Sequence, residues 1–226
     1  MDKKIKLKVP QRLRKGTLKK NQYASIKSAV EGFEFICKQL NIKKYQNVKM
    51  LDYGCGVKYT QAIIQQDIPV HSYTGVDVDK DMITYLKKHV QDPKFSYSQV
   101  PFQNAMYNPE GKPMMSDSDL GIGDKKFNLI ILLSVFTHLI PRDTRILLKI
   151  LRRYIEDDGR VFFTIFINDN LKKNFKDRFA DRPLLKAVYK SEFLEEAIAN
   201  ADFKIEKILD ENDIFNTKKQ YIISPK

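Results

Sequence analysis

The feature that most constrains the fold is a regular alternation of short apolar runs and longer amphipathic segments between residues 48 and 168. The apolar runs end at glycine, proline or acidic residues and predict buried strands, whereas apolar residues at helical spacing predict the helices between them. Such alternation is typical of a parallel sheet covered by helices. The predicted strands are residues 47–53, 72–78, 95–100, 127–136, 160–167, 203–209 and 219–224.

The last two predicted strands run in opposite directions. Only residues 210–218 join them, and a parallel connection needs a crossover of about a dozen residues or more. We therefore expect an α/β fold with a doubly wound, seven-stranded, mostly parallel sheet, an antiparallel last strand and helices on both faces. The predicted helices are residues 23–40, 60–66, 79–90, 141–156 and 191–200.

The positive charge of the chain is concentrated at its N-terminus. Residues 1–50 contain 14 Lys or Arg against 3 Asp or Glu, out of a net charge of +12 for the whole chain. We expect a basic arm (1–22) and a single domain (23–226), in which the basic segment 169–190 is an irregular insertion on the substrate side. Two interpretations of the arm stay open: a solvated extension, or a segment (3–20) that binds nucleic acid or another anionic surface.

Several classes of protein are disfavoured by composition. The chain has no apolar run of about 18 residues and no apolar signal segment, so neither a membrane span nor secretion is expected. Cys37 and Cys55 form no CxxC pair, which favours a reducing, cytoplasmic location. His71, His89 and His138 fall in separate segments without metal-ligand spacing, so no metal site is predicted. The sequence does not indicate an oligomeric state.

The first strand leads into a glycine-containing turn, LDYGCGVKYT (51–60). Asp52 ends the strand, and Gly54 and Gly56 let a ligand approach the backbone N–H groups of the turn. A dinucleotide fingerprint would need a third glycine where the chain has Tyr59, and no Gly-Lys-Ser/Thr of a P-loop follows. An acid ahead of the glycines would repel a pyrophosphate, so the turn favours a positively charged cofactor.

In order and spacing, the motifs of this chain resemble those of the class I S-adenosylmethionine-dependent methyltransferases. MLDYGCG resembles the first motif of the family and GVDVDKDMI the second, FNLIILLSVFTHL resembles the fourth, and DDGRVFFTIF resembles the entry to the fifth strand. The resemblance covers residues 45–225. It implies a Rossmann-like fold and S-adenosyl-L-methionine as the cofactor.

The resemblance also implies a set of cofactor-binding residues. In the family the acid that ends the second strand binds the ribose hydroxyls, and here that acid is Asp77. The acid often found near the adenine is missing, so Phe102, Asn104 or backbone N–H groups are expected to take its place. Cys55 is expected to be a small filler of the turn rather than a nucleophile. The predicted cofactor-binding residues are Asp52, Gly54, Cys55, Gly56, Asp77, Val78, Phe102, Asn104 and Ser134.

One residue of the turn departs from the family. Lys58 stands where the family commonly has its third glycine. Either the turn is shortened and the Lys58 side chain points away, or Lys58 is a plain substitution and lies beside the sulfonium.

The acceptor-binding chemistry is expected at the end of the fourth strand. Residues 134–138 lack the Asn/Asp-Pro-Pro-aromatic motif of DNA amino-methyltransferases, so DNA N-methylation is not expected. His138 is the candidate catalytic base, because an imidazole titrates near neutral pH. Alternatively, His138 caps the following helix or fills the wall. Tyr107 and Asn108 belong either to a substrate-facing loop or to a local turn.

Residues 104–112 and 134–139 also resemble bacterial methyltransferases of polysaccharide or secondary metabolism. This resemblance favours a hydroxyl of a sugar, a glycan or another small molecule as the acceptor. Two alternatives remain: methylation of RNA or another polyanion through the basic arm, and a non-catalytic module that only binds S-adenosylmethionine.

Overall fold

The structure is a computed structural model that describes residues 4–179, 181–210, 212, 214–215 and 218–226. Its strands are β1 (Lys49–Tyr53), β2 (Ser72–Asp77), β3 (Phe95–Gln99), β4 (Phe127–Leu132), β5 (Ile155–Ile167), β6 (Phe175–Asp177), β7 (Ala187–Tyr189), β8 (Phe203–Leu209) and β9 (Lys219–Pro225). Its helices are α1 (Gln22–Gln39), α2 (Lys58–Gln65), α3 (Lys80–His89), α4 (Pro141–Arg152) and α5 (Ser191–Ala199). None of the described helices is both long and apolar enough to cross a bilayer.

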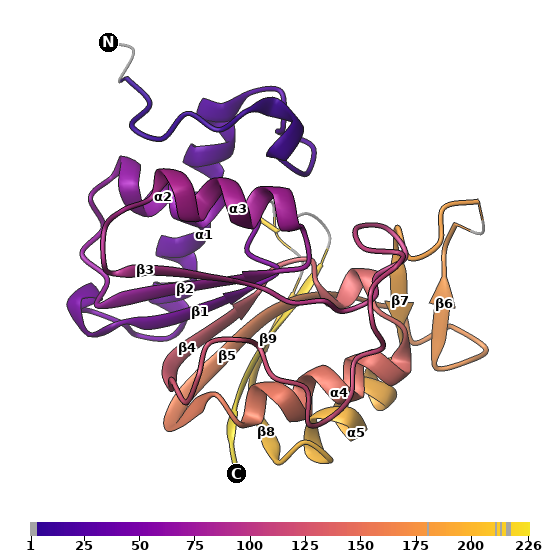
Figure 1. Cartoon of the computed structure of the whole chain (residues 1–226). Coiled ribbons are helices and arrows are strands. Elements are labelled where there is room, and N and C mark those ends of the chain that lie inside the picture. Colours follow the sequence, from indigo (N-terminus) through magenta and orange to yellow (C-terminus); the bar gives the residue numbers. More distant parts are fainter. Residues whose placement is uncertain (1–3, 180, 211, 213, 216–217) are drawn as a thin grey trace.

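The strands form one mixed sheet in the order β3-β2-β1-β4-β5-β7-β6, with β9 paired to β5 and β8 paired to β9 (Figure 1). Strands β1 to β5 pair in parallel with one another, and β9 runs antiparallel to both β5 and β8. The predicted doubly wound, mostly parallel sheet with an antiparallel last strand is confirmed. The short link between β8 and β9 explains the reversal, because it leaves no room for a crossover helix.

Helices cover both faces of the sheet (Figure 1). Alternate residues of β4 show the two faces: Leu129 and Ile131 pack with the side chains of α1, α2 and α3, whereas Ile130 and Leu132 pack with those of α4 and α5. All four side chains are fully buried. A strand buried on both faces reads as a continuous apolar run, which is why this segment is the most apolar of the sequence.

The sheet is larger than predicted. All seven predicted strands are present, and the described residues add β6 and β7 within segment 169–190, which was predicted to be irregular. Strand β7 is only three residues long, too short for a periodic signal, but Ala187 and Tyr189 are fully buried. From its sequence, Ser191 is expected to be the N-cap of α5, and this prediction is wrong. Lys190 is the N-cap residue, and the Ser191 N–H and hydroxyl both donate to Asp169, each at 2.8 Å.

Two predicted boundaries also change. Strand β4 ends at Leu132 rather than residue 136, because the chain turns at Ser134 (φ 61°) into a 3₁₀ turn at Phe136–His138. Helix α4 ends at Arg152 and β5 already begins at Ile155. Ile155 and Glu156, predicted to be the last residues of the helix, are therefore the first residues of a strand.

The N-terminal arm is not the solvated extension that one interpretation expected. Leu7, Val9 and Leu13 are buried, and they belong to the same hydrophobic cluster as the side chains of α1, α2 and α3. The Leu7 carbonyl accepts hydrogen bonds from the side-chain amides of Gln22 (2.7 Å) and Gln61 (2.9 Å). The arm therefore packs on the helical layer that covers one face of the sheet (Figure 1).

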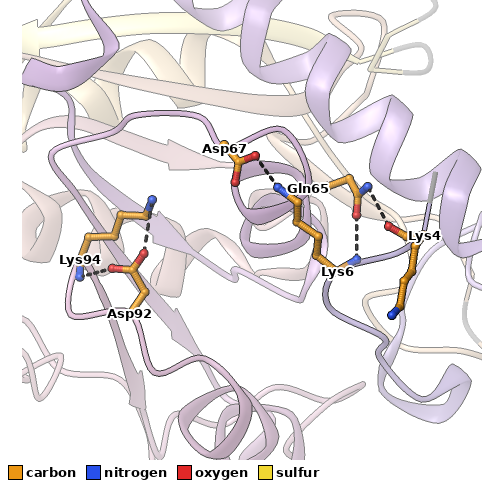
Figure 2. A network of polar contacts seen from close by, with 6 residues as sticks. All are labelled: Lys4, Lys6, Gln65, Asp67, Asp92 and Lys94. Carbon is orange, nitrogen blue, oxygen red and sulfur yellow. Dashed lines mark hydrogen bonds and ion pairs between the residues drawn. The ribbon is translucent and has the colours of Figure 1, made fainter.

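Polar contacts hold the outer part of the arm on α2 (Figure 2). The Gln65 side chain accepts from the Lys6 N–H at 3.0 Å and donates to the Lys4 carbonyl at 3.3 Å. The Lys6 ammonium forms an ion pair with Asp67. The arm thus uses part of its charge within the protein.

Candidate active site

A cavity of about 790 Å³ lies at the carboxyl ends of β1, β2, β4 and β5. This is the place where doubly wound folds bind ligands, and the volume suits a molecule of cofactor size. The structure brings all ten residues predicted for the site to the wall of this cavity, although their roles stay predictions. They are Asp52, Gly54, Cys55, Gly56, Asp77, Val78, Phe102, Asn104, Ser134 and His138.

The turn after β1 exposes its backbone to the cavity. Gly54 and Gly56 adopt left-handed conformations with φ of 73° and 50°, which glycine adopts without strain. The N–H groups of Gly54 and Cys55 donate to the Val76 carbonyl at 2.7 and 3.1 Å, which fixes the turn against β2. A Cβ atom on Gly54 would lie 2.6 Å from a methyl group of Val135, so only glycine fits there.

Asp77 ends β2 with its carboxylate held by the backbone. Its oxygens accept from the N–H groups of Gly56 (3.0 Å) and Asp79 (3.1 Å). Burial raises the pKa of Asp77, and these hydrogen bonds oppose the rise. The Asp79 side chain, and not Asp77, caps α3 through the Met82 N–H. Asp77 lies half-buried at the cavity wall. Because Asp79 is the cap, Asp77 has no capping role in α3.

Asp52 lies deeper than Asp77, with only 2% of its surface exposed. It accepts a hydrogen bond from the Tyr73 hydroxyl at 2.7 Å. Burial raises its pKa to about 7, against the effect of this hydrogen bond, and the neighbouring Asp77 adds to the rise. A positively charged ligand would favour the ionised forms of both carboxylates. Burial also raises the pKa of Cys55 far above its ordinary value, so this thiol stays protonated and fits the predicted filler role.

The arm contributes a wall of the cavity that was not predicted. Residues 14–18 line it, and two buried nitrogens of Arg14, Nε and Nη1, have no hydrogen-bond partner in the described chain. Arginine presents a permanently charged, planar set of N–H donors, so its place on the cavity wall suits an anionic ligand group. The Lys15 ammonium bonds the Asp79 carboxylate at 2.8 Å and lies 5.5 Å from the centre of the Tyr107 ring. It thus connects the arm to the far wall.

One signal could have identified the packed arm. Ile5, Leu7 and Val9 alternate with lysines, which is the period of an extended segment with one buried face.

Ser134 holds a strained turn at the end of β4. Its φ of 61° is uncommon for a residue other than glycine, and such strain is found at functional sites. The Ser134 N–H donates to the Thr164 hydroxyl and the Ser134 carbonyl accepts from the Thr137 hydroxyl, both at 2.8 Å. These two bonds fix the backbone that leads to His138.

His138 is fixed on both sides. Its Nδ1 lies 2.8 Å from the Leu184 carbonyl, and its own carbonyl accepts from the Asn104 amide at 3.0 Å. The Asn104 side-chain oxygen accepts from the N–H groups of Met106 and Tyr107, so both ends of this carboxamide bind protein groups. The geometry places Asn104 as a support of His138, whereas Phe102 is the aromatic side chain buried in the wall after β3.

The structure excludes one alternative for His138 and describes the segment of Tyr107 and Asn108, while the roles of these residues stay predictions. The N-cap of α4 is Ile140 and receives no side-chain hydrogen bond, so His138 does not cap that helix. Asn108 forms a local turn with Asn104 through two backbone hydrogen bonds of 2.9 Å, and the same turn presents Tyr107 to the cavity. The segment is therefore both a turn and part of the wall.

Lys58 does not point away from the cavity. It is the first residue of α2, lines the cavity and is half-buried, and burial lowers its pKa. The same cavity wall, near the end of β5, contains three residues that were not predicted for the site: Phe166, Lys186 and Lys218. Among the described residues, no group of three His, Cys, Asp or Glu side chains is arranged to hold a metal ion.

Comparison with known proteins agrees with this geometry. A family model described as a methyltransferase domain matches residues 12–208. A TehB-like S-adenosylmethionine-dependent methyltransferase from Corynebacterium glutamicum has a similar fold (TM-score 0.56, 15% identity, 88% of each chain covered).

Two further structures were obtained with cofactor. The magnesium protoporphyrin IX methyltransferase of Synechocystis, with bound S-adenosylhomocysteine, has a TM-score of 0.59 at 12% identity, covering 96% of this chain and 92% of that one. The glycopeptide N-methyltransferase MtfA, complexed with S-adenosylmethionine, has a TM-score of 0.59 at 10% identity, covering 88% and 94%. The chain therefore belongs to the methyltransferase domain family and is a methyltransferase with the class I, Rossmann-like fold of the S-adenosylmethionine-dependent enzymes.

Proposed function

We propose that the protein transfers the methyl group of S-adenosylmethionine to a hydroxyl of a small molecule, such as a sugar or a glycan. The bound cofactor supplies a methyl group on a positively charged sulfur, which an acceptor oxygen displaces in line. Catalysis of this displacement rests on alignment and on removal of the hydroxyl proton. The observation that carries the proposal is the position and tautomer of His138.

The hydrogen bond to Leu184 sets the tautomer of His138. A carbonyl oxygen only accepts, so Nδ1 carries the hydrogen and Nε2 of the neutral ring keeps its lone pair. No described residue hydrogen-bonds to Nε2. Burial lowers the pKa of His138, the Leu184 carbonyl opposes this, and the charge of Lys218 lowers it further. The imidazole is therefore neutral at neutral pH and ready to accept a proton.

The residues at the other end of the cavity suit the cofactor. Asp77 would bind the ribose hydroxyls, and a positively charged cofactor would favour the ionised forms of Asp52 and Asp77. The carboxylate of the methionine moiety would suit the guanidinium of Arg14, which lines the cavity. The exposed backbone of Gly56 leaves room for a close approach, since a Cβ atom there would meet nothing within 4 Å.

The first experiment separates cofactor binding from catalysis. Calorimetry should detect S-adenosylhomocysteine binding. In a separate assay with S-adenosylmethionine as the methyl donor, S-adenosylhomocysteine should form when a hydroxyl acceptor from a panel of sugars and small phenols is added. Absence of binding would favour the non-catalytic or an unrelated role. Binding with transfer only to amines or thiols would contradict the hydroxyl proposal.

Methylation of RNA remains the second candidate, because Lys19 and Lys20 of the arm are exposed. Phosphate contacts release counterions and make binding steeply dependent on salt. This candidate would be favoured by methyl transfer to RNA together with RNA binding whose affinity falls steeply with salt concentration, as several phosphate contacts require. The arm packs on the helices and uses part of its charge within the protein, which favours the small acceptor.

A further inference from the structure

Three lysines from distant parts of the chain line one side of the cavity. Lys58 begins α2, Lys186 immediately precedes β7 and Lys218 immediately precedes β9. The ammonium nitrogens of Lys186 and Lys218 lie 3.9 and 5.2 Å from the centre of the Phe166 ring, near the end of β5. Two of the cationic groups therefore share a single aromatic ring inside the cavity.

The acidic residues of the cavity lie at one of its ends. Among the described residues, only Asp52 and Asp77 are acidic lining residues, and both belong to the end of the cavity formed by β1 and β2. The structure shows no ion pair between Lys58 or Lys218 and any described carboxylate, and Lys218 donates to the Phe215 carbonyl at 3.1 Å. Lys218 thus carries its charge on the cavity wall without a described acidic partner.

The lysines also affect one another and the candidate base. Burial lowers the pKa of Lys218, and the charges of Lys186 and Lys58 lower it further. Lys218 in turn lowers the pKa of His138, so the positive charge acts on the imidazole. Like charges held together in a partly desolvated cavity are stabilised when an anion binds between them.

We propose that the acceptor carries an anionic group, a carboxylate or a phosphate, which Lys218 binds beside the Phe166 ring so that a neighbouring hydroxyl lies at His138. This inference rests on the proposed hydroxyl methylation and specifies its substrate class. Phe166 provides an apolar surface beside the two ammonium groups, which suits an aromatic or other planar body for the acceptor. The cofactor carboxylate is another anion that Lys218 would fit, and the test distinguishes the two sources.

The test begins with the complex of the full chain and S-adenosylhomocysteine at constant ionic strength. Three compounds are titrated and followed by the histidine ring signals in NMR: 4-hydroxybenzoate, 4-hydroxyphenyl phosphate and the neutral 4-hydroxybenzamide. We expect at least one anion to bind about tenfold more tightly than the amide, as charge-assisted hydrogen bonds allow. The better anion identifies the carboxylate or the phosphate class. Equal affinities, or no saturable binding of either anion, would overturn the proposal.

Variants assign the effect to Lys218. Lys218→Gln should weaken the anion about tenfold while the affinities for the amide and for S-adenosylhomocysteine stay unchanged. Lys218→Arg should retain most of the anion affinity. The matched control is Lys172→Gln, an exposed lysine of the basic segment 169–190 outside the cavity, which should change nothing.

The outcomes separate this proposal from the proposed function. If Lys218→Gln weakens S-adenosylhomocysteine as much as the anion, Lys218 serves the cofactor and the inference is wrong. If the unmodified protein does not bind S-adenosylhomocysteine, the proposed function fails instead. Thermal unfolding of each variant identifies any loss of affinity that follows from unfolding.

Discussion

The two ends of the cavity are built in opposite ways. The end proposed for the cofactor, called the cofactor end below, consists of strand ends and glycines, and its acids Asp52 and Asp77 are held by a tyrosine hydroxyl and by backbone N–H groups. The end proposed for the acceptor, called the acceptor end, consists of side chains from irregular segments: His138, Lys186 and Lys218. Carboxylates therefore line only the first end, and the candidate base and two lysines line the second. If this division holds, substitutions at each end should change only the ligand of that end.

The largest effect is expected for His138→Gln. Removal of a general base lowers turnover by about 10²–10⁴-fold, whereas the cofactor end is untouched and the affinity for S-adenosylhomocysteine should not change. Single-turnover rates and calorimetry measure the two quantities. The control is His89→Gln, an exposed histidine stacked on Tyr85 of the same helix. Full activity of His138→Gln would remove the base from the mechanism.

The next effect tests the contribution of the arm to the cofactor end. Arg14→Gln should weaken S-adenosylhomocysteine about tenfold, because a charged hydrogen bond to its carboxylate is lost. Binding of 5′-methylthioadenosine, which lacks that carboxylate, should not change.

Arg12→Gln is the matched control for this prediction, since Arg12 is exposed on the same arm and does not line the cavity. An equal loss for both ligands in Arg14→Gln would show that the arm acts through packing rather than through the carboxylate.

The cofactor end could be predicted from the sequence because it depends on local patterns. The apolar run of β1 places Asp52 at a strand end, and the glycines mark the turn that follows. Asp79 stands directly ahead of a helical segment in the sequence, which predicts it as the N-cap of α3, and the structure confirms this cap. Asp77 is thereby left available for a ligand, and that role stays a prediction. These signals lie within a few residues of one another.

The acceptor end could not be predicted in the same way. Lys186 and Lys218 meet at Phe166 only because β7 and β9 both pair with β5. The three residues of β7 are too few for a period-2 pattern, so nothing local marks Lys186 as a cavity residue. The place of Arg14 on the cavity wall was not predicted for a related reason. Lysines dominate the composition of the arm, and they obscure the alternating apolar residues Ile5, Leu7 and Val9, of which Leu7 and Val9 are buried.

A smaller effect is expected for Asp77→Ala. The loss of hydrogen bonds to the ribose should reduce cofactor affinity by at least ~1 kcal/mol, or about fivefold, without a specific effect on the acceptor. Asp81→Ala, an exposed acid in the first turn of α3, is the control. Unchanged affinity for S-adenosylhomocysteine in Asp77→Ala would remove Asp77 from the site.

The smallest expected effect lies in the pH dependence of turnover. Only neutral His138 accepts a proton, and its pKa is lowered from the ordinary value of about 6.5, so kcat/KM should rise with pH below neutrality and level off above it. Lys218→Gln removes a positive charge that lowers this pKa. The acidic limb of the profile should therefore move to higher pH, by a fraction of a unit.

The shift of the acidic limb in Lys218→Gln tests whether Lys218 and His138 belong to one end of the cavity. The pH profile is measured as kcat/KM for a neutral hydroxyl acceptor, so that loss of anion binding in Lys218→Gln does not contribute. Lys172→Gln should leave the acidic limb in place, because Lys172 is not among the charges that shift the pKa of His138. A limb that does not move in Lys218→Gln would mean that the lysine and the base do not share one electrostatic environment, and the acceptor end would then be two separate sites.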